Sequence, residues 1–245
     1  MLGFILFFTF ISSILSLLIV SIFLVKKSFI KKISFNLVAF AAGALLATGI
    51  TDTLPEAVKR SDSTFIVLTL SIALFFVIER VFLHLHHHEA EEGETLKLPL
   101  PLLLFGDALH NFIDGLSLAS TFLISFPLGV VTAIAIFVHE IPHELGDFGI
   151  LIHMGFKRSK ALLFNLSMSL PAFLGAFIGF FIGNKIEGIL PILLTVTSAN
   201  FIYLSLSDLL PELYEKAKGK GAVFQALYFL LGVSFILIIE HFLKA

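Results

Sequence analysis

Cysteine is absent from the 245-residue sequence. Its absence excludes disulfides, thiolate metal sites and redox motifs, and it leaves the redox compartment undetermined. Charged residues are also scarce, at 14% of the chain, whereas hydrophobic residues make up 58%. Together with a mean hydropathy of +1.02, this composition lies outside the range of water-soluble globular domains and indicates an integral membrane protein in contact with a lipid bilayer.

The charge balance gives little support to partners other than lipid. The formal net charge is −2, and neither end of the sequence is strongly acidic or basic. We therefore expect no nucleic-acid partner. The first apolar run, residues 2–25, has no basic segment before it and no small-residue cleavage site after it. This pattern predicts a membrane span and not a removable signal.

Apolar runs long enough to cross a bilayer recur along the whole chain. A membrane-spanning helix needs about 20 apolar residues. The sequence offers eight such runs, near residues 2–25, 35–57, 64–85, 98–123, 127–155, 161–182, 189–214 and 222–243. We predict an all-α integral membrane protein with eight transmembrane helices that form a single domain over residues 1–245.

The loops between these runs carry most of the positive charge. With the N-terminus outside, 12 of the 16 Lys and Arg residues fall in loops on the cytoplasmic side. The positive-inside rule then predicts that the N- and C-termini are both outside. It also places a His-rich loop, residues 84–97, in the cytoplasm. Its histidines either collect or sense metal ions or belong to a solvated polar run: His84, His86, His87 and His88.

A short repeat relates the second and seventh runs. The second ends in DTLPE at 52–56 and the seventh in DLLPE at 208–212. Because these spans cross the membrane in opposite directions, the repeat is typical of transporters built from inverted repeats. The alternative is a shared way of ending a helix with proline and an interfacial carboxylate.

Ionisable residues gather inside two neighbouring spans, although a central Asp there costs about 2.5 to 3.5 kcal/mol. In span four the polar residues are spaced i, i+3, i+4 and i+7, which places them on one helix face: Asp107, His110, Asn111 and Asp114. Span five has similar spacings in HEIPHELGD: His139, Glu140, His143, Glu144 and Asp147. The short connection at 125–127 makes these helices antiparallel neighbours, so we expect their polar faces to meet.

Mixed imidazole and carboxylate donors suit Zn(II), Fe(II) and Mn(II), whereas Ca(II) and Mg(II) prefer oxygen ligands alone. A structural metal site is usually closed by four ligands, but these two spans offer more. We interpret the surplus as a pathway for a divalent transition-metal ion. The alternative is an interhelical hydrogen-bond network without a ligand, which so many ionisable residues disfavour.

Two of these motifs resemble a known family. HNFIDG at 110–115 and HEIPHELGD at 139–147 are similar to motifs of the ZIP (Zrt/Irt-like) divalent metal transporters, and the HEIPHE variant resembles the LIV-1-type zinc transporters. The resemblance implies an inverted three-plus-two-plus-three arrangement of spans in a transporter domain. Transfer of the family's metal ligands onto this chain gives His110, Asn111, Asp114, His139, Glu140 and His143, with Glu144 as an added candidate.

The resemblance also implies what is moved. The expected substrate is Zn(II), with Fe(II), Mn(II), Co(II) and Cd(II) as other ions that the same donors accept. The ion would travel toward the cytoplasm, and no cofactor is expected. A homodimer is compatible with the resemblance, and the plasma membrane is the expected location because the sequence shows no retention signal.

The chain departs from the family pattern at two places. Some members supply a bridging carboxylate from span six, where this chain has Leu170 before Pro171. A second central metal is therefore in doubt. In span two, ATGITD at 47–52 leaves Asp52 without the His that LIV-1-like members often carry, so the chemistry of the entrance differs.

Two other functions use the same residues. His139-Glu140-Ile-Pro-His143 has the HExxH form of zinc proteases, in which two His hold zinc and Glu is the general base. An intramembrane zinc metalloprotease is therefore the main alternative, although Pro142 inside the motif and the surplus ligands disfavour it, and we expect no enzymatic activity. A metal sensor or a proton-coupled carrier of another solute is the third reading.

Overall fold

The structure is a computed structural model, and it describes residues 1–23, 27–87, 100–186, 188–216 and 220–244. The described residues are almost entirely helical and contain no strand. Three long helical stretches include a π-helical segment. They are α1 (Leu2–Thr9), η1 (Phe10–Leu15) and α2 (Ser16–Phe23); α3 (Lys27–Ala47), η2 (Thr48–Thr53) and α4 (Leu54–Val58); and α9 (Ile189–Tyr203), η3 (Leu204–Leu209) and α10 (Leu210–Lys216). The other helices are α5 (Thr64–His87), α6 (Leu100–Ile124), α7 (Phe126–His153), α8 (Arg158–Lys185) and α11 (Lys220–Lys244).

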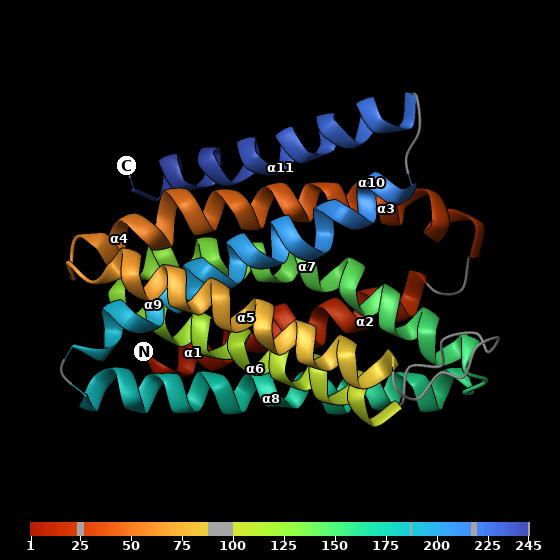
Figure 1. The fold of residues 1–245 in the computed structure, drawn as a ribbon, viewed down its shortest axis with the longest axis horizontal. Helices are drawn as coiled ribbons and strands as arrows, with labels where there is room; N and C mark the ends of the chain where they lie inside the picture. Colours follow the sequence, from red (N-terminus) through yellow and green to blue (C-terminus); the bar gives the residue numbers. More distant parts are fainter. Residues whose placement is uncertain (24–26, 88–99, 187, 217–219, 245) are drawn as a thin grey trace.

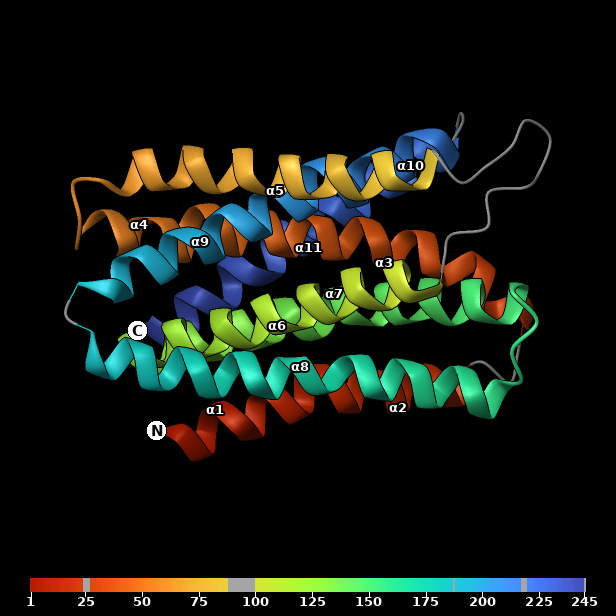
Figure 2. The ribbon, with the colours of Figure 1, turned by 60° about the horizontal axis from the view of Figure 1, so that its bottom comes forward.

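The helices lie side by side along one axis, and both chain ends lie at the same end of the bundle (Figures 1 and 2). Within the described residues, seven stretches are long and apolar enough to cross a membrane: Leu2–Ser21, Asn36–Val58, Thr64–Val81, Phe126–His153, Arg158–Lys185, Ile189–Leu209 and Gly221–Leu243. The prediction of a multi-pass helical membrane protein is confirmed at this level.

The eighth long helix of the described chain is α6, which is not among these seven. Its polar residues lower its hydropathy, because Asp107, His110, Asn111 and Asp114 all fall within it. The helix nevertheless runs parallel to the others through the bundle (Figure 2). We call these four residues the polar stripe of α6. The polar stripe is therefore the reason that α6 is not among the seven apolar stretches.

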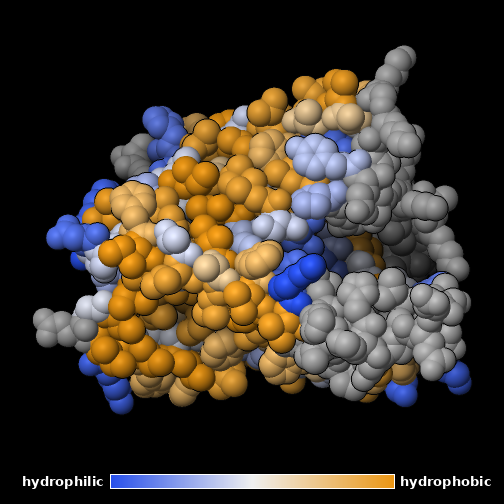
Figure 3. Space-filling model, viewed as in Figure 1, coloured by the Kyte–Doolittle hydropathy of each residue, from blue (hydrophilic) through white to orange (hydrophobic). Residues whose placement is uncertain are grey.

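The outer surface matches a lipid environment. In α5 and α11 only 11% of the spanning window is buried, against 56% in α7, and their exposed side chains include Phe65, Ile66, Leu230 and Ile238. Hydrophobic residues dominate the face shown in Figure 3. A helix bundle that turns apolar side chains outward and polar ones inward satisfies its polar groups within the protein, as lipid requires.

Close helix approach depends on glycine at two reciprocal contacts. A Cβ at Gly115 of α6 would overlap the carbonyl oxygen of Ala172 in α8, and one at Gly175 of α8 would overlap that of Phe112 in α6. Gly43 of α3 and Gly232 of α11 are related in the same way to each other's helices. Small residues allow such approach in membrane bundles, so α8 fixes the position of α6 at the level of its polar stripe.

The two copies of the sequence repeat share a local structure. Each has a π-helical segment just before its proline, because the amide of Leu54 donates to Gly49 and that of Leu210 donates to Ser205, five residues earlier. The helices that carry the two copies run in opposite directions (Figure 1). The common geometry agrees with the repeat, while the full inverted three-plus-two-plus-three arrangement stays a prediction.

Candidate metal site

Helices α6 and α7 bring their polar faces together because one residue separates them. Ser125 lies between the helices in an extended conformation, and its Oγ accepts a hydrogen bond of 3.2 Å from the amide of Leu128. This N-cap starts α7 immediately after α6 ends. The two helices are therefore antiparallel neighbours, as the sequence predicts.

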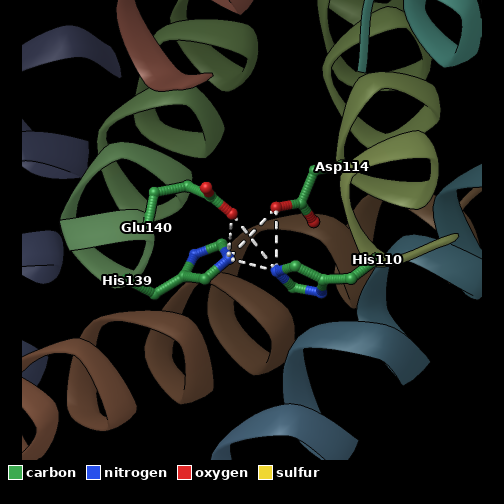
Figure 4. Close-up of side chains that lie close together, drawn as sticks. All are labelled: His110, Asp114, His139 and Glu140. Carbon is green, nitrogen blue, oxygen red and sulfur yellow. Dashed lines mark hydrogen bonds and ion pairs between the residues drawn. The ribbon is translucent and has the colours of Figure 1, made fainter. Parts of the chain in front are cut away.

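Four side chains of these helices converge on one point, and we call them the first group: His110, Asp114, His139 and Glu140. One donor atom from each lies within 4.8 Å of the others. His110 and Asp114 reach in from α6, and His139 and Glu140 from α7 (Figure 4). Two imidazole nitrogens and two carboxylate oxygens form a donor set that suits a transition-metal ion.

The contacts within the first group are short. His139 Nε2 lies 3.0 Å from Asp114 Oδ2, and His110 Nε2 lies 3.2 Å from Glu140 Oε1. The two Nε2 atoms are themselves 3.2 Å apart. His139 Nδ1 donates to the carbonyl of Ala135 at 3.2 Å, so in the neutral imidazole the Nε2 atom keeps the lone pair that a metal ion needs.

Several buried oxygens of this group lack a hydrogen-bond partner. Among the described residues Asp114 Oδ2 and both carboxylate oxygens of Glu140 have no hydrogen-bond partner, although Asp114 Oδ2 and Glu140 Oε1 lie in ion-pair range of the histidines. Buried polar atoms are nearly always hydrogen-bonded, and unpaired ones call for an explanation such as an ion. Carboxylates that are buried, lack a hydrogen bond and converge on a shared point fit a bound cation.

Three further side chains form a second group, which lies about one helical turn further along the same two helices: Asp107, His143 and Asp147. His143 Nδ1 lies 3.2 Å from Asp147 Oδ2 and 3.9 Å from Asp107 Oδ1. Asn111 Nδ2 donates to Asp107 Oδ1 at 2.9 Å. The amide of Asn111 is thus turned toward the second group, while its own Oδ1 is buried without a hydrogen bond.

Glu144 points to a different helix. Its carboxylate accepts a hydrogen bond of 2.8 Å from Asn165 Nδ2 and one of 3.4 Å from Ser169 Oγ, both on α8. All three side chains are buried. Among the described residues Glu144 belongs to neither group of donors. Its hydrogen bonds link α7 to α8.

The structure therefore divides the seven residues predicted from the sequence. Four form the first group, His143 belongs to the second, Asn111 lies beside the second, and Glu144 faces α8. Leu170 is 56% exposed, so the position before Pro171 in α8 faces outward. Residues 88–99 lie outside the described chain, and α5 ends at His87, so the role of the His-rich loop at 84–97 stays a prediction.

Sequence reasoning did not include Asn200 among the site residues. This buried residue of α9 places its Nδ2 atom 3.5 Å from Asp114 Oδ1. It occupies the side of the carboxylate that turns away from the histidines. The one amide side chain of α9, a helix without charged residues, was the available signal, but only the packing of α9 against α6 shows which residue it meets.

Fold and site together define a class: a multi-helix membrane protein that encloses a buried His and carboxylate cluster. The ZIP Zinc transporter family model matches residues 89–240. This is more than half of the chain, and the protein therefore belongs to the ZIP zinc transporter family. The resemblance drawn from HNFIDG and HEIPHELGD is confirmed.

Curated relatives give the same assignment. The chain is 43% identical to zinc transporter ZIP4 of Mus musculus over 112 residues, which are 46% of this chain and 17% of that protein. It is 36% identical to ZIP6 of Homo sapiens over 148 residues, 58% of this chain and 20% of the relative. For ZIP10 of Danio rerio the identity is 35% over 112 residues, 46% of this chain and 13% of the relative. The match thus spans a fifth or less of the length of these relatives.

Proposed function

We propose that this protein carries Zn(II), or a similar divalent transition-metal ion, across a membrane toward the cytoplasm. The observation that carries the proposal is the first group, in which two imidazoles and two carboxylates converge inside the bundle and carboxylate oxygens have no hydrogen-bond partner among the described residues. Family membership and relatives named as zinc transporters support the same function. Fe(II), Mn(II), Co(II) and Cd(II) are chemically acceptable to the same donors.

In this proposal His110, Asp114, His139 and Glu140 hold the ion while it is enclosed. Burial removes the water that would otherwise fill the coordination shell, so the four donors supply it. His143 serves the ion on its way out together with Asp107, whose carboxylate accepts a hydrogen bond from Asn111. Glu144 keeps α8 against α7 through Asn165 and is not required as a ligand.

The proposal also includes the predicted topology. The polar helix α6 would cross the membrane as an eighth span, enclosed by α7, α8 and α9, which contact it. Both chain ends would lie outside, and both lie at the same end of the bundle (Figure 1). The plasma membrane is the proposed location, and a homodimer is compatible with the exposed apolar faces.

Transport requires that the site open to each side in turn. We place this movement between α6 and α7 on one side and α3 and α9 on the other, because α6 packs against α9 and α7 packs against α3. A rocking or sliding of one helix group around a fixed site is the usual means of alternating access. Asn200 contacts Asp114 across this boundary.

The geometry disfavours the protease. A zincin uses both histidines of HExxH on one ion and leaves the glutamate free as a base. Here His139 belongs to the first group with Glu140, and His143 belongs to the second with Asp107 and Asp147. Glu140 lies among the donors themselves, 3.5 Å from His139 Nε2.

Uptake of radioactive zinc into proteoliposomes tests the proposal. We expect saturable uptake by the wild type, loss of uptake in His139→Ala, and unchanged uptake in Asp62→Asn, whose side chain is exposed far from the site. Wild-type protein that binds zinc without moving it, and cleaves a membrane peptide in a manner abolished by Glu140→Gln, would establish the protease instead.

A further inference from the structure

We infer that Asp107, His143 and Asp147 form a second metal-binding site, which receives the ion from the first group before it leaves toward the cytoplasm. The inference rests on the proposed function for its role in transport. Its existence as a binding site is independent of that role, because it follows from the geometry of the second group.

The three side chains have the chemistry of a metal site. Their donor atoms, one nitrogen and two oxygens, lie within 4.8 Å of one another. His143 Nδ1 and Asp147 Oδ2 are buried atoms without a hydrogen-bond partner in the described part of the chain, although they lie in ion-pair range of each other at 3.2 Å. A nitrogen and an oxygen left without hydrogen bonds at this distance are the arrangement that a shared cation satisfies.

Asn111 orients one ligand of this site, the carboxylate of Asp107. Its Nδ2 atom donates both to the carboxylate of Asp107 at 2.9 Å and to the carbonyl of Asp107 at 3.2 Å. Asn111 is itself buried. A hydrogen bond to a ligating carboxylate fixes the orientation of the ligand, so the role of Asn111 is to position Asp107.

The second group lies on one defined side of the first. Asp107 precedes His110 along α6, while His143 and Asp147 follow His139 along α7. Because the helices are antiparallel, both shifts point toward the end of the bundle where α6 begins and α7 ends (Figure 2). That end carries Lys157, Arg158 and Lys160, which the positive-inside rule places in the cytoplasm.

Exposure rises in the same direction. The side chains of Asp114 and His139 are 2% and 1% exposed, whereas those of His143 and Asp147 are 25% and 13% exposed. An ion in the second group therefore has three protein donors and regains water in its remaining positions. Fewer protein ligands and more water give weaker binding, as a release step requires.

The two groups are near enough for direct transfer. The ring of His110, in the first group, stacks on the ring of His143, in the second, with centroids 4.7 Å apart. A second ion arriving in the first group would repel one already in the second, as in ion pathways with adjacent sites. The ion would thus leave in steps and avoid one deep trap.

Equilibrium binding of zinc to purified protein tests the site directly. The background carries serine in place of the loop histidines, so that they add no binding: His84, His86, His87 and His88. We expect two zinc ions per chain in this background and one in Asp107→Asn/Asp147→Asn. Asp107→Glu/Asp147→Glu, which keeps both carboxylates, should retain two, and Asp62→Asn should match the background. Two ions bound by the Asn double variant would overturn the inference.

Transport separates this inference from the proposed function. In proteoliposomes the Asn double variant should lower the maximal zinc uptake rate on the order of tenfold, the loss typical of a disturbed metal site. The half-saturating concentration should change little, because capture occurs at the first group. Unchanged maximal uptake would overturn the exit role. A background protein that binds two ions but transports none would refute the proposed function and leave the second site standing.

Discussion

The Nε2 atom of His139 lies 3.0 Å from Asp114 Oδ2, and this contact joins α7 to α6 inside the first group. The Nδ1 atom of His139 donates to the carbonyl of Ala135, so in the neutral ring the Nε2 lone pair faces a carboxylate oxygen. Two electron-rich atoms repel at this distance unless a proton or a cation lies between them. The contact therefore marks the place where a metal ion should stabilise the protein most.

Asp114→Asn should separate metal binding from folding. Asparagine keeps the size of the side chain and can donate to His139 Nε2, so the melting temperature without zinc should not fall. The carboxylate charge is lost, and zinc affinity should drop by at least about tenfold. Thermal unfolding in detergent with and without zinc measures both effects, because a bound ligand raises the melting temperature by mass action.

Asp62→Asn is the matched control, since Asp62 is exposed in the connection between α4 and α5, which lies at the opposite end of the bundle from the start of α6 (Figure 2). It should keep the full rise in melting temperature with zinc. An equal rise in Asp114→Asn would contradict the assignment of Asp114 as a ligand.

Glu140 and Glu144 are one helical turn apart, and replacement of each by glutamine should affect zinc uptake differently. Glu140→Gln should lose zinc uptake, because a metal-facing carboxylate becomes a weaker amide donor. Glu144→Gln should keep uptake close to the wild type, since its carboxylate faces Asn165 and Ser169. The amide oxygen of Gln can accept the short hydrogen bond from Asn165, and its amide nitrogen can donate to the Ser169 hydroxyl. Uptake of radioactive zinc compares the pair, and equal loss in both would restore Glu144 as a ligand.

Much of the fold could be predicted from the sequence, because a lipid bilayer strongly restricts the structures that can cross it. Long apolar runs must be helices that satisfy their own backbone, and the run predicted at 127–155 corresponds to Phe126–His153. The observed helices extend beyond the predicted apolar runs where polar residues continue the helix. The run at 35–57 belongs to a helix that already starts at Lys27, and the run at 161–182 to one spanning Arg158–Lys185.

The site was predictable in composition but not in grouping. Spacing along α6 and α7 shows which side chains share a face, and these do meet. It does not fix how each helix is rotated about its axis relative to its neighbour. Rotation and offset along the axis together decide that His139 and His143, one turn apart on α7, meet different residues of α6, and that Glu144 faces α8. The contact of Asn200 with Asp114 depends on the packing of a distant span and leaves no pattern in the local sequence.

Asn165→Leu should destabilise the protein through Glu144. The substitution removes the 2.8 Å hydrogen bond to the Glu144 carboxylate and leaves a buried acid with one long contact from Ser169. An unsatisfied buried group costs about 1 to 3 kcal/mol, and more when charged. Unfolding free energies of Asn165→Leu, Glu144→Leu and the double variant form a mutant cycle. The double variant should be more stable than Asn165→Leu alone, and strictly additive losses would contradict the link.

Gly175→Ala should loosen the packing of α8 against the helix that carries Asp114. Alanine ordinarily favours a helix over glycine by about 1 kcal/mol, but its Cβ at this position would overlap the carbonyl of Phe112 in α6. The helices must separate, and such overpacking costs about 1 to 3 kcal/mol.

Gly146→Ala is the matched control, because no atom of the described residues lies within 4 Å of its Cβ position. Thermal unfolding should therefore show a lower melting temperature for Gly175→Ala and an equal or higher one for Gly146→Ala. Since α6 also carries His110 and Asp114 of the first group, zinc affinity should fall in Gly175→Ala alone. Equal behaviour of the two variants would mean that α6 and α8 are not in close contact at Gly175.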